Sequence, residues 1–136
     1  MSVTLQAAGS WARNVIRNGA AMNTSDPGSH TLEAVRSRYA ADMLSIANVN
    51  DPRLQAVMAS VPRERFLGEP PWQFVSMEDG YKEAPSADPA LVYQDVLFAL
   101  DPVRGLNNGS PSLHAALLHA LDVQPNDRVV HIGAGT

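Results

Sequence analysis

The last eight residues of this chain carry its clearest chemical signal. The apolar run Val129-Val130-His131-Ile132 passes directly into Gly133-Ala134-Gly135-Thr136. A run of this kind favours a buried strand, and the glycines after it let the backbone turn sharply toward a ribose, a phosphate or an amino-acid group. A single Gly-x-Gly also occurs in ordinary tight turns, so the spacing alone leaves a nucleotide-like site and a plain turn equally open.

Two further groups of side chains could do chemistry. Ser110 offers a hydroxyl, but it directly precedes Pro111, and this pair is typical of the first two positions of a helix, so we expect a capping role. His114, His119 and Asp122 lie close together in the sequence. A spacing of five residues turns two histidine rings about 140° apart on a helix, so this group predicts no metal site.

Composition narrows the classes of partner. The chain has 136 residues, of which 45% are hydrophobic and 18% charged, which suits one domain with a core. A net charge of −4 offers no broad positive face, so we expect no nucleic-acid binding. The chain has no cysteine, which is compatible with a reducing cytosol, and we expect a cytoplasmic location. No apolar run approaches the roughly 18 to 20 residues of a membrane-spanning helix.

Three helices are expected to position these groups. Apolar residues at spacings of three or four predict a helix over about 31–47. Asp51-Pro52 predicts the start of a second helix, which Pro62 must end. Ser110-Pro111 opens the clearest helix. Its predicted buried face consists of Leu113, Ala116, Leu117, Ala120 and Leu121.

The rest of the chain has weaker patterns. Residues 73–109 are interrupted by glycine and proline, which predicts a long loop with short strands or turns at 91–93 and 96–100. A long loop of this kind is often a binding segment. We expect residues 1–29 to be a loosely ordered N-terminal extension and residues 30–136 to belong to the folded domain.

Four segments occur in a recognisable order, and together they resemble one enzyme family. They are Val61-Pro62-Arg63-Glu64-Arg65-Phe66, Tyr93-Gln94-Asp95, the turn from Asn107 to Pro111, and the run from Asp127 to Thr136. In this order they are similar to the protein-L-isoaspartate O-methyltransferase family, over roughly residues 37–136.

The resemblance implies an α/β fold, the Rossmann-like fold of class I methyltransferases. The chain would carry its N-terminal helices, a loop-rich segment and only the first core strand. It also implies that the cofactor is S-adenosylmethionine and that the partner is a damaged protein. The enzyme would methylate the carboxylate of an L-isoaspartyl residue, which begins its repair.

The same resemblance assigns roles to residues. It places the cofactor beside Ile132, Gly133, Ala134, Gly135 and Thr136. Tyr93 and Asp95 would lie on the substrate side. The family's serine, associated with the substrate carboxylate, falls on Gly109, which has no hydroxyl, and Ser110 follows one place later. His131 stands where the family has an acid. Both departures concern the substrate more than the methyl donor.

We therefore expect an N-terminal fragment of such an enzyme, truncated at the cofactor loop and inactive alone. Two alternatives stay open. The chain could belong to a related S-adenosylmethionine-dependent methyltransferase with another substrate, or it could be a truncated product without catalytic activity whose helices serve as an interaction module. The sequence gives no indication of an oligomeric state.

Overall fold

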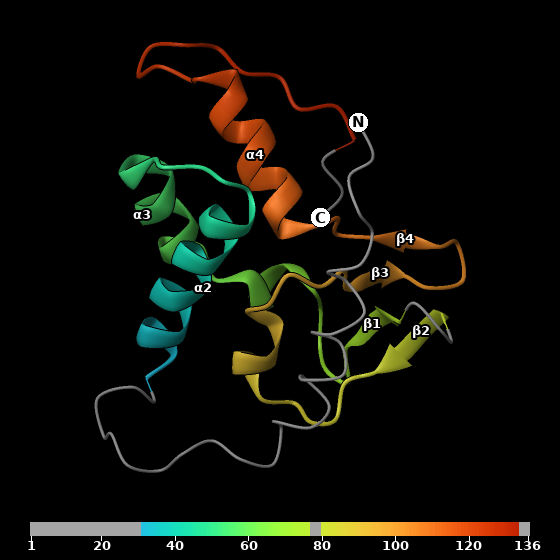
Figure 1. Ribbon diagram of the computed structural model, residues 1–136. Coiled ribbons are helices and arrows are strands. Elements are labelled where there is room, and N and C mark those ends of the chain that lie inside the picture. Colours follow the sequence, from blue (N-terminus) through green and yellow to red (C-terminus); the bar gives the residue numbers. More distant parts are fainter. Residues whose placement is uncertain (1–30, 77–79, 134–136) are drawn as a thin grey trace, which may run out of the picture.

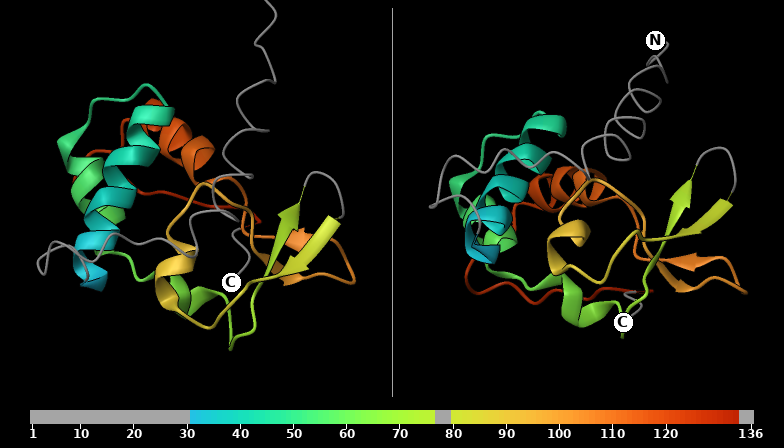
Figure 2. Two further views of the ribbon diagram at one scale, coloured as in Figure 1. Left: turned by 60° about the horizontal axis from the view of Figure 1, so that its bottom comes forward. Right: turned by 90° about the horizontal axis from the view of Figure 1, so that it is seen from below.

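The computed structural model describes residues 31–76 and 80–133, which combine helices with small antiparallel sheets (Figure 1). Helices α2, α3 and α4 lie on one side of the molecule and two hairpins lie on the other (Figures 1 and 2). The predicted N-terminal extension, residues 1–29, lies outside the described residues, as do Ala134, Gly135 and Thr136.

Local capping signals fix the first two described helices. Helix α2 spans Leu32–Ile46 and is capped by the hydroxyl of Thr31. Helix α3 spans Pro52–Ser60 and is capped by the carboxylate of Asp51, with its proline in the first turn, where a missing N–H costs nothing. Both predicted helices are confirmed, and the two helices pack against each other.

Two β-hairpins occupy much of the segment that was expected to be a long loop. Strand β1, Gln73–Ser76, pairs antiparallel with β2, Gly80–Glu83. Strand β3, Ala99–Asp101, pairs antiparallel with β4, Leu106–Asn107. The expectation of a long loop is therefore wrong for this region. The strands are two to four residues long, too short for an alternating pattern to stand out in the sequence.

The short elements that the sequence did indicate are confirmed only in part. The segment 91–93 belongs largely to a 3₁₀ helix, η2, at Pro89–Val92. The segment 96–100 leads into β3, and an isolated bridge pairs Phe98 with Phe74 of β1. This bridge therefore joins the first hairpin to the segment that leads into the second.

The core connects helix α2 to the irregular segment before the second hairpin. Its buried hydrophobic residues are Tyr39, Met43, Trp72, Ala84, Val92, Tyr93, Val96 and Phe98. The rings of Tyr39 and Tyr93 meet edge to face, with 5.5 Å between their centroids. The core therefore fixes the backbone around residues 92–96 against α2.

Helix α4 spans Pro111–Leu121, and its predicted cap, Ser110, is confirmed by a hydrogen bond from the Leu113 amide. Its buried residues are Pro111 and Ala115, which lie on the side that faces α2 and α3. The predicted buried face is wrong, since Leu113 is 55% exposed and Leu121 is 62% exposed. Periodicity identifies an apolar stripe on a helix, but not whether another element covers it.

The segment expected as the first core strand forms no strand in the described part of the chain. Residues 127–131 are irregular, and Ile132 and Gly133 form a turn. Val129 and Val130 are exposed, and Ile132 is 92% exposed. A strand needs a neighbour that accepts and donates backbone hydrogen bonds, and none of the described strands pairs with this segment.

None of the helices in residues 31–76 and 80–133 combines the length and the apolar character that crossing a lipid bilayer requires.

Candidate functional site

The N-terminal end of α4 brings together two of the residues that the sequence singled out, Asp95 and Ser110. Asp95 Oδ1 accepts a hydrogen bond from the Ser110 hydroxyl at 3.1 Å and another from the Ser112 backbone N–H at 3.0 Å. Asp95 Oδ2 accepts from the Ser112 hydroxyl at 2.6 Å. One carboxylate therefore joins the irregular segment to the first turn of the helix.

Arg63 holds the backbone that carries Asp95. Its guanidinium Nη1 donates to the carbonyl of Val92 at 2.6 Å and to that of Gln94 at 3.0 Å. The guanidinium also lies over the ring of Tyr39, 5.1 Å from its centroid. Burial lowers the pKa of Arg63 from its usual value, although the neighbouring tyrosines oppose this effect. An arginine stays protonated in either case, so its guanidinium keeps the N–H groups that hold the carbonyls of Val92 and Gln94.

Tyr93 belongs to a different cluster from Asp95, although both were predicted on the substrate side. Its hydroxyl lies 2.7 Å from Arg36 Nε and 3.2 Å from the backbone nitrogen of Arg63, and it donates to the Glu64 carboxylate. Arg36 also pairs with Glu64, with 2.6 Å between Nη2 and Oε1. Tyr93 is 6% exposed, so its buried side chain holds the segment around residues 92–96 against the core. Its contact with a substrate stays a prediction.

This cluster shifts the pKa values of its members. Partial burial by itself raises the pKa of Glu64, but the hydrogen bond from Tyr93 and the charge of Arg36 outweigh burial and hold that pKa below its usual value. Burial, followed by the contact with Glu64, raises the pKa of Tyr93. Glu64 is therefore ionised and Tyr93 is neutral near pH 7, which is the pairing that the hydrogen bond requires.

Gly109 lies directly beneath the imidazole of His114. A Cβ atom added to Gly109 would stand 2.8 Å from Nε2 of His114 and 2.9 Å from its Cε1. Gly109 also has φ +73°, in the left-handed region that favours glycine. The amide of Gly109 donates to the side chain of Asn107 at 3.0 Å, which fixes the turn before α4. The positive φ therefore favours glycine at position 109, and a Cβ there would also require the exposed ring of His114 to move.

Sequence reasoning missed the roles of Ser112 and His114. The contact of His114 with Gly109 depends on the left-handed turn at position 109, for which the sequence gave no signal. Ser112 gave no signal either, because its bond to Asp95 depends on a segment that lies 17 residues earlier.

The terminal loop is described only as far as Gly133. Gly133 has φ +76°, and no atom lies within 4 Å of the position that its Cβ would take. Gly68, Gly80 and Gly105 also combine a positive φ with free space, so the place of Gly133 in a binding loop stays a prediction. In the described part of the chain, no hydrogen bond joins Ile132 or Gly133 to Asp95, and His131 is exposed.

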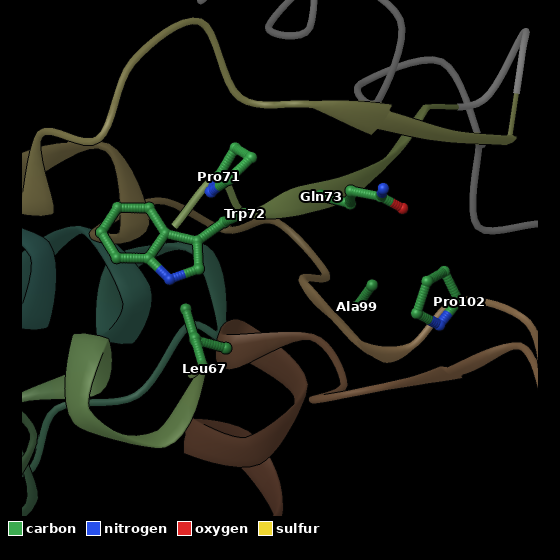
Figure 3. A pocket seen from close by; sticks show the side chains of 6 residues that line it. All are labelled: Leu67, Pro71, Trp72, Gln73, Ala99 and Pro102. Atoms are coloured by element: carbon green, nitrogen blue, oxygen red, sulfur yellow. The ribbon is translucent and has the colours of Figure 1, made fainter. Parts of the chain in front are cut away.

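A small surface pocket lies elsewhere, between the turn after η1 (Arg63–Phe66) and the hairpins (Figure 3). It is lined by Leu67, Pro71, Trp72, Gln73, Ala99 and Pro102. Its volume of about 150 Å³ is below the range of several hundred Å³ in which small molecules usually bind. Trp72 is a core residue there, and its Nε1 donates to the carbonyl of Gly68 at 3.1 Å. This pocket contains none of the predicted site residues.

The histidines of α4 have separate surroundings. His119 Nδ1 lies 3.3 Å from a carboxylate oxygen of Asp51, whereas His114 lies over Gly109. Asp122 is 4.0 Å from Arg53. Within residues 31–76 and 80–133, no three histidine, cysteine or acidic side chains are placed to hold a metal ion together.

Comparison with known proteins identifies two curated relatives. The chain is 33% identical over 103 residues to protein-L-isoaspartate O-methyltransferase 1 of Rhodopseudomonas palustris (strain HaA2), which covers 76% of the chain. It is 34% identical over 93 residues to protein-L-isoaspartate O-methyltransferase of Rhodopseudomonas palustris (strain ATCC BAA-98 / CGA009), which covers 68% of the chain. The chain spans about a third of the length of each relative. The resemblance predicted from the sequence is confirmed.

No protein-family model matches the chain, and no solved structure matches it.

Proposed function

We propose that this chain forms the first part of a protein-L-isoaspartate O-methyltransferase. The enzyme would transfer a methyl group from S-adenosylmethionine to the carboxylate of an L-isoaspartyl residue in a damaged protein. The observation that carries this proposal is the identity of 33% over 103 residues to a relative of that name. A cytoplasmic location is part of the proposal.

The proposed fold of the whole enzyme is Rossmann-like. Within it, the segment from Val129 to Ile132 would become the first core strand when neighbouring strands pair with it. The β-branched residues of this segment and the open glycine that follows support this assignment. In the proposed domain, residues 30–136 supply the N-terminal helices, the hairpins and this strand.

The cofactor would lie along Ile132, Gly133, Ala134, Gly135 and Thr136. S-Adenosylmethionine supplies a methyl group that its sulfonium has already activated. Gly133 fits a role in holding it, since its φ of +76° and the free space around it let a ligand contact the backbone directly. The role of the chain at this loop is to bind the cofactor and to orient it.

The substrate would bind at the N-terminal end of α4. A carboxylate is already a nucleophile, so the reaction needs a group that positions it rather than a base that removes a proton. Asp95 and Ser110 would position the groups around this site. Their hydrogen bond joins the start of the helix to the segment whose carbonyls Arg63 holds. Tyr93 supports that segment through Arg36 and Glu64.

The test is an assay of the complete gene product that contains this chain. We expect it to methylate a peptide with an L-isoaspartyl residue, detected as methanol released from the ester, and not the same peptide with ordinary aspartate. Cofactor binding without either reaction would favour a related methyltransferase with another substrate, which the departures at Gly109 and His131 suggest. The absence of both binding and turnover would favour a protein without catalytic activity.

A further inference from the structure

Helix α4 has the composition of a helix that is covered on more than one side. Its residues, Pro111–Leu121, include no lysine, arginine, aspartate or glutamate. Helix α2 differs, since Arg38 and Asp42 lie exposed on its surface. A surface helix normally carries charged residues on the side that faces water, whereas a helix without them is normally covered all round. The composition of α4 therefore indicates that a further element packs against it.

The described residues cover only one side of α4. Pro111 and Ala115 are buried on the side that faces α2 and α3. Leu113, Leu117 and Leu121 form a leucine stripe, and each of them is more than half exposed. At about 100° per residue, Leu117 points about 160° away from Ala115. The leucine stripe therefore lies opposite the buried side of the helix.

The segment after α4 is a second apolar surface without cover. A turn joins it to the helix, in which the Gln124 amide donates to Asp127 Oδ2 at 2.8 Å and the Asp127 amide donates to the Gln124 carbonyl at 3.0 Å. Connections of this length are common between a helix and the next strand in α/β proteins. Val129, Val130 and Ile132 follow the turn and are exposed. The helix and the segment that follows it in Figure 1 therefore both lack a covering layer.

We infer that the leucine stripe of α4 packs against one face of the sheet that the remaining part of the enzyme builds beside residues 129–132. This inference rests on the fold in the proposed function. A parallel sheet has helices on both of its faces, so strands that pair with residues 129–132 would also present a face to α4. The chain spans about a third of the length of its curated relatives, which leaves enough polypeptide for such strands. One layer would then cover both apolar surfaces.

Cysteine labelling tests whether the leucine stripe is covered. The 136-residue chain has no cysteine, so Leu117→Cys places its single thiol on the stripe. Maleimide labelling of the peptide that contains residue 117 is followed by mass spectrometry, in this chain and in the complete gene product. We expect labelling to be at least 10-fold slower in the complete product. Val103→Cys is the matched control, because Val103 is almost fully exposed between β3 and β4 and should react equally fast in both.

Leu117→Glu gives a second measurement that does not depend on a thiol. It should lower the melting temperature of the complete gene product by about 5 °C or more, because the carboxylate would have to enter an apolar contact. The melting temperature of the 136-residue chain should not change, since the side chain faces water there. Val103→Glu is the control and should change neither protein.

The outcomes separate this inference from the activity in the proposed function. Equally fast labelling of Leu117→Cys in both proteins would overturn the inference. Slow labelling in both would also overturn it, because the stripe would then be covered by residues 1–30 or by a second copy. Protection in the complete product that is lost on dilution would assign the stripe to a second copy instead. An enzyme that methylates the isoaspartyl peptide but labels fast at residue 117 keeps its function without this packing. Protection without methylation supports the packing and contradicts the activity.

Discussion

Asp95 holds Ser112 with both of its carboxylate oxygens, one on the backbone N–H at 3.0 Å and one on the hydroxyl at 2.6 Å. The two residues lie 17 positions apart, so this pair ties the irregular segment after η2 to the first turn of α4. The two residues belong to different elements. This carboxylate is therefore one of the contacts that hold the two elements together, beside the backbone hydrogen bond from Asn108 to Phe98.

Asp95→Asn is the direct test of this contact. The amide keeps the size of the side chain but loses the charge and presents N–H groups to a hydroxyl donor. We expect the free energy of unfolding to fall by about 1 to 3 kcal/mol, measured by urea denaturation. Asp42→Asn is the control, since Asp42 is 60% exposed and its ion pair with Arg38 spans 3.9 Å. A loss no greater than that of the control would contradict the prediction.

Tyr93→Phe should destabilise the protein through the groups that it leaves behind. Removal of the hydroxyl deprives Arg36 and Glu64 of a partner in a partly buried cluster, and we expect a loss of about 1 to 3 kcal/mol in the free energy of unfolding. Tyr81→Phe is the matched control, because among residues 31–76 and 80–133 the Tyr81 hydroxyl has only a 3.5 Å contact with the Asn107 side chain. Equal effects of the two substitutions would exclude an anchoring role for Tyr93.

The lowered pKa of Glu64 predicts a dependence of stability on pH. Because the carboxylate is favoured in the folded state, its contribution is present above the usual pKa of 4.5 and is lost as the pH falls through the lowered value. Glu64→Gln should therefore reduce the difference in unfolding free energy between neutral and acidic pH. Urea denaturation at several pH values measures this difference. A pH profile of the unfolding free energy that is unchanged in Glu64→Gln would contradict the stabilising role of the Glu64 carboxylate.

Tyr39 predicts the opposite behaviour at alkaline pH. Burial raises the pKa of Tyr39 from 10.0 to about 12, so the neutral phenol is favoured in the folded state. Its contribution to stability is fully present below pH 10 and is lost as the pH rises toward 12. Phenolate absorbance should show a late phase whose amplitude falls in Tyr39→Phe, while the raised pKa of Tyr93 accounts for what remains. The same titration in urea is the control, and there the late phase should be absent in both proteins.

Gly109→Ala tests the contact between Gly109 and His114 through a double-mutant cycle. Gly105→Ala is the matched control, because Gly105 has φ +71° and nothing within 4 Å of its Cβ position. Both substitutions introduce backbone strain of about 1 to 2 kcal/mol, but only Gly109→Ala also displaces the imidazole. Its excess cost over Gly105→Ala should disappear in a His114→Ala background. An excess that persists there would rule out the contact.

The 136-residue chain by itself should not bind S-adenosylmethionine with micromolar affinity. Val129, Val130 and Ile132 are exposed, and no described strand pairs with the segment that leads to Gly133. Isothermal titration calorimetry measures this directly. The complete gene product is the comparison, and tight binding by the shorter chain would show that the loop is organised without further strands.

The sequence predicted those elements whose signals are local. Thr31, Asp51 and Ser110 cap their helices as their positions suggest, because a cap requires only residues within one turn. The hairpins were missed because the pairing of Gln73 with Glu83 is a property of two segments. The buried face of α4 was assigned wrongly for a related reason. The burial of an apolar stripe depends on which other element packs against it, and the helix sequence alone does not contain this information.

The sequence identified several residues of the candidate site, but not which of them contact one another. Asp95 and Ser110 were both identified, and they do lie together. The resemblance placed Tyr93 with Asp95 on the substrate side, yet the Tyr93 hydroxyl contacts Arg36 and Glu64, 57 and 29 residues earlier. The contact of His114 with Gly109 depends on the left-handed turn at 109, which only the three-dimensional structure reveals.

The exposed face of α4 also has a consequence for the behaviour of the chain in solution. Leu113, Leu117 and Leu121 present contiguous hydrocarbon to water along one side of the helix. A surface of this kind binds fluorescent apolar dyes and promotes self-association as the concentration rises. Light scattering should therefore depend on concentration, and a change of Leu117 to glutamate should weaken that dependence without touching the buried side of the helix.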